Sequence, residues 1–89
     1  MKLTLRQLDI FLAVARQENV SKAAEELNLS QSAASAALQS LERAYSVKLF
    51  ERTGNRLTLS SIGSNLRNEA EALCAHARQF EQALQQHGE

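Results

Sequence analysis

The sequence predicts a mainly α-helical protein that carries one small β-hairpin and ends in a long helix. Three observations predict this fold class. Apolar residues recur at helical spacing in most of the chain, polar and apolar residues alternate at 56–59, and a heptad pattern of apolar residues runs through 61–86. With 89 residues, of which 44% are hydrophobic, the chain can build one modest core.

The first helix is predicted to begin after Thr4. The Thr4 hydroxyl can accept from the first turn, and Gln7 stands where a capping box needs it. The helix should end near Gln17, where Glu18-Asn19 closes the pattern. Its apolar residues form a stripe that we expect to be buried, namely Leu5, Leu8, Phe11, Leu12 and Ala15.

Residues 20–45 predict two helices joined by a tight turn. Ser21 is the expected N-cap of the first, Asn28 can end it in the left-handed conformation, and Ser30 can cap the second. The second helix is expected at 31–45. One of its faces is apolar and consists of Ala34, Leu38, Leu41 and Tyr45.

The opposite face of this second helix is uncharged and consists of Gln31, Ser32, Ser35 and Gln39. Alanines at 23, 24, 33, 34, 36 and 37 allow the two helices to cross closely. A short helix that braces a second one with a hydrogen-bonding outer face is typical of a helix-turn-helix. An ordinary helical hairpin in a bundle is the alternative for this stretch taken alone.

A β-hairpin is predicted after the second helix of this pair. Thr53-Gly54-Asn55 has turn chemistry, and residues 56–59 alternate as a strand does. Arg52 and Arg56 would stand near the tip. Because an isolated two-stranded hairpin is marginal, it must pack on the helices, through Phe50, Leu57 and Leu59.

A long final helix is predicted from Ser61 to about Gln86, capped by Ser60. It would span roughly 39 Å at about 1.5 Å per residue, more than the preceding domain can cover. The alternative is a helix folded back on its own domain, but an open stripe predicts a second copy of the chain as partner. The expected dimerisation residues are Leu66, Ala70, Leu73, Ala77, Phe80 and Leu84.

The charge is balanced overall but unevenly distributed. Residues 1–60 hold eight Lys and Arg against six Asp and Glu, a formal charge of +2, and residues 61–89 carry −2. The segment 43–56 contains four cations and one acid. Because nucleic-acid binders are usually basic, any contact with nucleic acid must be local here.

The composition also predicts which functions are absent. No apolar run is long enough to cross a bilayer and the N-terminus does not resemble a signal peptide, so we expect a cytoplasmic protein without a membrane partner. Cys74 is the only cysteine, which excludes an internal disulfide. Neither His76 nor His87 has an acid placed to orient it, so we expect no enzyme, metal or cofactor site, and Cys74 is interpreted as a packing residue.

Five motifs in order and at matching spacing resemble the N-terminal DNA-binding domain of LysR-type transcriptional regulators. They cover about two-thirds of the chain. The motifs are L-R-Q-L-D-I-F-L-A-V-A (5–15), S-K-A-A-E-E-L-N-L-S-Q-S-A-A-S (21–35), L-E-R (41–43), V-K-L-F-E-R (47–52) and L-S-S-I-G (59–63).

The resemblance implies a winged helix-turn-helix at 1–60 and a linker helix for dimerisation at 61–89, followed in such regulators by an effector domain. It implies that the chain is an operator-reading fragment in the bacterial nucleoid. A homodimer would bind an interrupted palindrome in double-stranded DNA, with the recognition helix in the major groove and the wing near the minor groove. A small-molecule effector would act only through the further domain. The alternative is a helical interaction module without DNA binding.

The resemblance also implies roles for individual residues. The expected base contacts are Gln31, Ser32, Ser35, Ala36 and Gln39. The expected contacts to the DNA backbone are Ser30, Arg43, Lys48 and Thr53. The expected wing residues near the minor groove are Arg52, Asn55 and Arg56. Two positions depart from the family pattern: Ser32 stands where Pro is frequent, and Ala36 stands where Arg or Lys is common.

Overall fold

The computed structural model describes residues 1–88 and has the predicted fold class, four helices and one antiparallel hairpin. The elements in chain order are α1 (Leu5–Gln17), α2 (Val20–Glu26), α3 (Gln31–Tyr45), β1 (Phe50–Thr53), β2 (Arg56–Leu59) and α4 (Ser61–His87).

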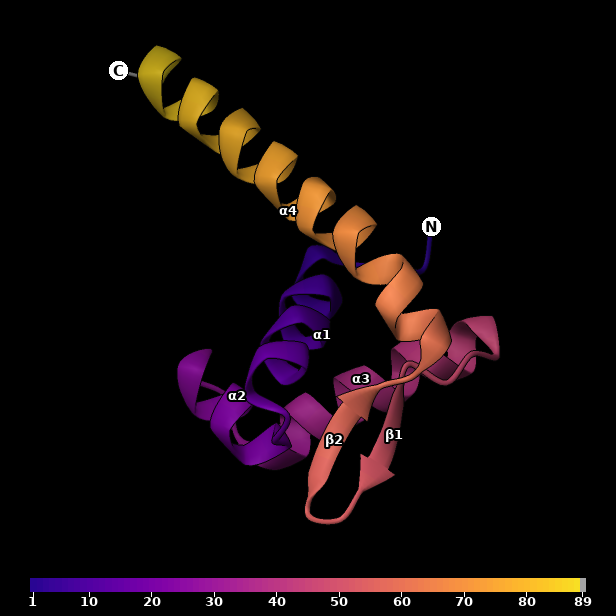
Figure 1. Cartoon of the computed structure of the whole chain (residues 1–89). Helices are drawn as coiled ribbons and strands as arrows, with labels where there is room; N and C mark the ends of the chain where they lie inside the picture. The colour runs from indigo at the N-terminus through magenta and orange to yellow at the C-terminus, as the bar shows by residue number, and fades with distance from the viewer. Residues whose placement is uncertain (89) are drawn as a thin grey trace.

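Helix α1 is the centre of the molecule, because it packs against α2, α3, α4 and β2. Figure 1 shows α4 running from the hairpin past α1, with its C-terminal half projecting beyond the other helices. The molecule is therefore elongated, with extents of 50 × 25 × 20 Å. Within residues 1–88 no helix combines the length and apolar character that spanning a bilayer requires.

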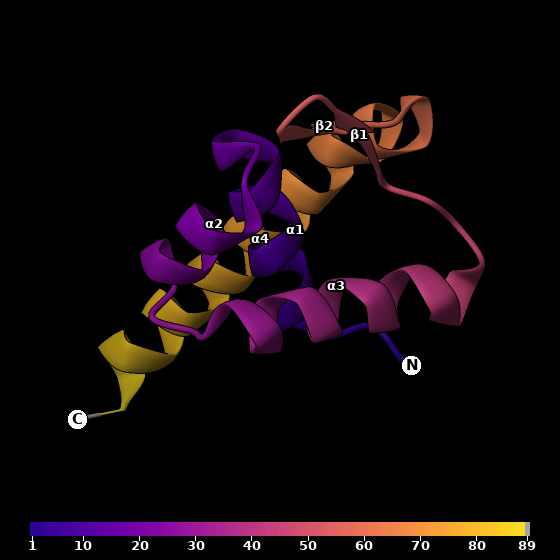
Figure 2. The ribbon, with the colours of Figure 1, turned by 90° about the horizontal axis from the view of Figure 1, so that it is seen from below.

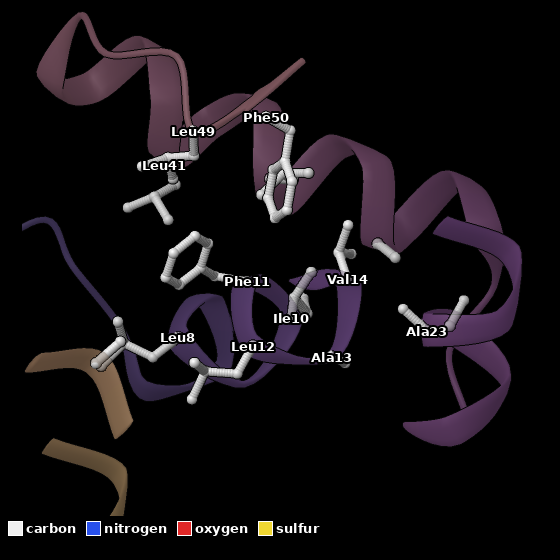
Figure 3. Close-up of a cluster of buried hydrophobic side chains, with 14 of the residues drawn as sticks. Leu8, Ile10, Phe11, Leu12, Ala13, Val14, Ala23, Leu41, Leu49 and Phe50 are labelled. Carbon is white, nitrogen blue, oxygen red and sulfur yellow. The ribbon is translucent and has the colours of Figure 1, made fainter. Parts of the chain in front are cut away.

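The core is built on α1, which contributes six buried residues between Leu8 and Val14. Figure 3 shows side chains from α1, α3 and β1 converging on one another. The rings of Phe11 and Phe50 meet edge to face with their centroids 5.6 Å apart. This aromatic contact ties the hairpin to α1.

Most predicted caps are confirmed, and one is wrong. Thr4 and Gln7 form the predicted capping box, and Ser30 caps α3 by accepting from the Ala33 amide at 3.1 Å. Helix α2, however, begins earlier than predicted. Its N-cap is Asn19, whose side-chain oxygen accepts from the Lys22 amide at 2.9 Å, so Ser21 lies inside the first turn. Asn caps at least as well as Ser, and the chain can therefore re-enter a helix directly after α1.

The hairpin has the predicted turn and packing. Gly54 occupies the left-handed region with φ of +63°, which glycine adopts without strain. Phe50 pairs with Leu59, and Arg52 pairs with Leu57. Phe50 is buried, and Leu57 and Leu59 are half-buried against the core, as predicted.

The start of α4 is locked onto the segment that precedes β1. The Ser60 hydroxyl donates to the Lys48 carbonyl at 2.6 Å and accepts from the Gly63 amide at 3.0 Å, while the Ser60 amide donates to the Leu49 carbonyl at 2.9 Å. Gly63 lies so close to this segment that a Cβ atom would overlap the Leu49 carbonyl oxygen. These contacts therefore fix the orientation of α4 relative to the hairpin.

The apolar stripe of α4 is only partly open. Ala70 is 4% exposed and belongs to the core of its own chain, which makes it unavailable to a partner and corrects its assignment as a dimerisation residue. Ala77 is half-buried. The remaining stripe residues are exposed and large, namely Leu66, Leu73, Phe80 and Leu84. The alternative, a final helix that folds back on its own domain, thus holds for one side of α4.

Two apolar residues are more exposed than the helical patterns predicted. Leu5, expected in the buried stripe of α1, is exposed because it lies in the first turn, beside the projecting half of α4. Tyr45, expected on the buried face of α3, is exposed because the helix ends there. A periodic pattern therefore overstates burial at the ends of a helix.

Cys74 is buried against α1, and its thiol donates to the Asp9 carboxylate at 3.6 Å. Burial raises the pKa of the Cys74 thiol, and the nearby Asp9 charge raises it further. The thiol is consequently a poor nucleophile, which is consistent with a packing role.

Candidate nucleic-acid interface

The predicted base-contact residues lie on the outer, solvent-facing side of α3. Gln31, Ser32, Ala36 and Gln39 are exposed, and Ser35 is half-buried. No charged residue occurs between positions 31 and 41. The face therefore presents amides, hydroxyls and methyl groups, which are groups that read base edges in a major groove.

The opposite side of α3 fixes the helix in place. Ala34, Leu38 and Leu41 are buried in the core. Helix α2 braces α3 through Ala23 and Ala24, which are almost completely buried and allow the close crossing that the alanines predicted. The exposed face of α3 thus rests on a rigid support.

In Figure 2 the chain leaves the end of α3 and turns back to the hairpin. Residues of the hairpin and of this face of α3 together line two grooves. A groove of about 270 Å³ has Ser35 and Gln39 on one side and Arg52 on the other. A smaller groove of about 140 Å³ brings Gln31 together with Arg52 and Asn55. Arg52 lines both grooves, so the structure brings this wing arginine to the predicted base-contact residues.

The two wing arginines lie on opposite faces of the hairpin. Directly paired residues of an antiparallel hairpin point to the same face. Arg52 pairs with Leu57 and shares the inner face with Phe50, whereas Arg56 pairs with Thr53 on the outer face. The Thr53 hydroxyl lies 3.0 Å from the Thr58 hydroxyl on that outer face.

Arg56 is engaged by a residue that the sequence did not identify as part of the site. Its Nε lies 3.2 Å from a Glu18 carboxylate oxygen in an ion pair, and the Arg56 side chain is 66% exposed. The Glu18 carbonyl also accepts from the Leu57 amide at 3.0 Å. From the sequence, Glu18 is only the end of the first helix. No local pattern reveals this pair, because the partners are far apart in sequence and neither contact is periodic.

The remaining predicted cations lie at the C-terminal end of α3. Arg43 and Lys48 are exposed and line a common surface groove with Gln39. Ser46 ends α3 in the left-handed conformation with φ of 54°, and Glu42 accepts from the Leu49 amide at 2.7 Å. Glu42 thereby holds the segment that carries Lys48, a role that sequence reasoning missed.

The interface is therefore uncharged along the outer face of α3, and its margins combine cations with Glu18 and Glu42. Arg43 and Lys48 flank the C-terminal end of α3, and Arg52 flanks it from the wing. Such an arrangement suits double-stranded DNA, in which base edges lie between two rows of phosphates.

The groups considered for catalysis or metal binding lie elsewhere. His76 and His87 are exposed on α4, away from α3 and the hairpin. Within residues 1–88 no group of three or more His, Cys, Asp and Glu residues could hold a metal ion.

Comparison with known proteins identifies relatives along nearly the whole chain. A family model described as "Bacterial regulatory helix-turn-helix protein, lysR family" matches residues 5–64. The HTH-type transcriptional regulator CfxR of Cupriavidus necator is 42% identical over 83 residues, which are 93% of this chain and 26% of CfxR. The RuBisCO operon transcriptional regulator of Allochromatium vinosum is 39% identical over 85 residues, 96% of this chain and 28% of that protein. The chain thus spans about a quarter of the length of these curated relatives.

Solved structures share the fold over most of this chain. A complex of CbnR_DBD with DNA matches with a TM-score of 0.86 and 28% identity over 98% of this chain and 100% of that one. A complex of BenM_DBD with benA site 1 DNA matches with a TM-score of 0.88 and 26% identity over 97% of each chain. An OxyR C206 mutant of Corynebacterium glutamicum matches with a TM-score of 0.90 and 30% identity over 92% of this chain and 26% of OxyR. From the family match over residues 5–64, the chain belongs to the lysR family of bacterial regulatory helix-turn-helix proteins.

Proposed function

We propose that this chain binds double-stranded DNA sequence-specifically, as the operator-reading part of a bacterial LysR-type transcriptional regulator. The observation that carries the proposal is the uncharged, exposed face of α3 beside a wing whose Arg52 shares grooves with Gln31 and Gln39. Its likeness to the CbnR_DBD and BenM_DBD complexes with DNA supports the same docking here. The binding role, rather than a catalytic one, fits relatives named as transcriptional regulators.

Base readout would come from α3 in the major groove. The Gln31 amide can bridge N6 and N7 of adenine, while Ser32, Ser35 and Gln39 can donate or accept. The Ala36 methyl suits the thymine methyl group. Because residues 31–41 contain no Arg or Lys, this part of α3 lacks the usual bidentate reader of guanine, so its half-site readout should favour A·T pairs.

Contacts to the DNA backbone would come from the margins of this face. Arg43 and Lys48 are exposed and free of ion pairs within residues 1–88, which suits them to phosphates at the C-terminal end of α3. Ser30 can donate its hydroxyl hydrogen to a phosphate while its oxygen still caps α3. Thr53 would contact the backbone from the tip of the wing, beside the turn, and Arg52 and Asn55 would approach the minor groove.

Dimerisation would place two copies of α3 on one duplex. The exposed stripe of α4, now without Ala70, consists of Leu66, Leu73, Ala77, Phe80 and Leu84. A two-fold pairing of such helices would present two recognition helices to an interrupted palindrome, since protein symmetry and operator symmetry correspond. Effector sensing is assigned to the part of such regulators beyond the matched residues. Binding to the operator would place the protein at the bacterial nucleoid.

The salt dependence of binding separates this function from a helical interaction module. Binding of the chain to labelled duplex should weaken steeply between about 50 and 200 mM salt, with log K falling by about 0.9 per log unit of salt for each phosphate neutralised. The measurement is fluorescence anisotropy across a salt series. Binding that is undetectable at every salt concentration, or that does not change with salt, would contradict the proposal.

A further inference from the structure

Glu18 joins the helix-turn-helix to the wing at two points. Its carboxylate forms an ion pair with Arg56 at 3.2 Å, and its carbonyl accepts from the Leu57 amide at 3.0 Å. Glu18 ends α1 in the left-handed conformation, with φ of 54°, and directly precedes Asn19, the N-cap of α2. Helices commonly end in this conformation, and Asn28 and Ser46 adopt it as well.

The pairing of the hairpin strands places the two wing arginines on opposite faces, where they have different neighbours. Arg52 lies on the inner face, in the grooves shared with Gln31 and Gln39. Arg56 lies on the outer face and reaches back to Glu18. Of these two arginines, Arg52 is the one that lies beside the base-reading side chains without an ion-pair partner in residues 1–88.

We propose that Glu18 is a positioning residue of the DNA-binding face. Its carboxylate holds Arg56 on the outer face of the wing and leaves Arg52 as the wing arginine that meets DNA. The inference rests on the proposed function. Its consequence is a lower sequence-independent affinity, because phosphate contacts by arginine strengthen binding to every sequence alike.

Removing the Glu18 charge would act in two ways that an experiment must separate. Any acid lost near DNA reduces general repulsion, whereas loss of Glu18 also releases Arg56. Glu51→Gln is the matched control, because Glu51 is exposed on the same hairpin and makes no ion pair within residues 1–88. Glutamine has almost the shape of glutamate, so Glu18→Gln keeps the left-handed backbone and its bond to Leu57.

The test measures the slope of log K against log salt for a random-sequence duplex. We expect Glu18→Gln to steepen the slope by about 0.9 relative to the unmodified chain, the value of one additional phosphate contact. Adding Arg56→Gln to that variant should return the slope to its original value. Arg56→Gln alone should leave the slope unchanged, and Arg52→Gln should reduce it by about 0.9. Glu51→Gln should change affinity without adding a contact.

Several outcomes would overturn the inference. A loss of about 0.9 in slope on Arg56→Gln alone would mean that Arg56 contacts DNA despite Glu18. If Glu18→Gln and Glu51→Gln change the salt slope equally, the loss of Glu18 acts only through the general repulsion between an acid and DNA. Matching thermal melting curves verify that each variant folds. The proposed function fails separately if the unmodified chain binds no duplex, whereas this inference fails if that chain binds and the slopes do not separate.

Discussion

Gln31 is the first residue of α3 and directly follows Ser30, whose hydroxyl caps the helix. The cap fixes the backbone from which the Gln31 side chain extends. The same dependence recurs elsewhere in the site. Lys48 follows a turn held by Glu42, and Arg52 lies opposite the half-buried Leu57. At the scale of residues, each exposed side chain is therefore positioned by a neighbouring residue that fixes the backbone. Single substitutions can distinguish a residue that contacts DNA from one that positions such a residue.

Gln31→Ala should reduce affinity by about 1–3 kcal/mol at one base position of each half-site, because one bidentate amide contact is lost. Affinities for a series of operators with single base changes measure this loss. The control is Ser40→Ala, at an exposed position of the same helix but outside the predicted contact set. It should leave the affinity for every operator unchanged. An equal loss at every base position would make Gln31 a phosphate contact instead.

Gly63→Ala should destabilise the fold by about 1–3 kcal/mol, because the added methyl group overlaps the Leu49 carbonyl and lies 2.9 Å from the Leu59 Cδ2 atom. Urea denaturation measures the change in the free energy of unfolding. Ser64→Ala, at the next and exposed position of α4, should change it little. Unchanged stability of the Gly63 variant would contradict the close approach of α4 to this segment.

At the scale of elements, local signals identified every helix and both strands, since caps, turn residues and periodicity act over a few residues. The cap of α2 is the exception, because two good capping residues, Asn19 and Ser21, stand two positions apart. The heptad pattern placed Ala70 in the open stripe because such a pattern does not reveal which side the domain covers. Contacts between distant segments, such as Glu18 with Arg56, leave no local pattern at all.

The N-cap of α2 can be tested by two alanine substitutions in one helix end. Asn19→Ala should cost about 1 kcal/mol of stability, because the Lys22 amide loses its acceptor. Ser21→Ala should stay within about 0.5 kcal/mol, since alanine is favoured inside a helix turn. Thermal and urea denaturation of both variants provide the comparison. The reverse order of the two effects would restore Ser21 as the cap.

The exposed stripe of α4 can be tested by placing a charge on it. Phe80→Glu should abolish the dimer, because Phe80 is 67% exposed in the single chain and would be buried between two copies. Sedimentation measures the mass of the particle. Ala75→Glu adds the same charge at an exposed position on the opposite side of the helix and should leave the dimer intact. If the Phe80 variant sediments as a dimer, this stripe is not the interface.

At the scale of the whole molecule, a chain of zero formal net charge can bind DNA because its charges are separated. Arg43, Lys48 and Arg52 border the outer face of α3. Helix α4 carries two arginines against three glutamates and projects away from that face (Figure 1). This separation was visible in the sequence. The orientation of the wing, which puts Arg52 inside and Arg56 outside, required the register of the hairpin.

Sequence-specific reading by a dimer is best tested by selection from a pool of random duplexes at two salt concentrations, followed by sequencing of the bound DNA. We predict enrichment of a two-fold symmetric site with A·T pairs in its half-sites, and steep loss of binding at the higher salt concentration. Bound DNA without any enriched sequence would contradict sequence-specific reading by α3. Enrichment of a site without symmetry would contradict the dimer while leaving the reading by α3 intact.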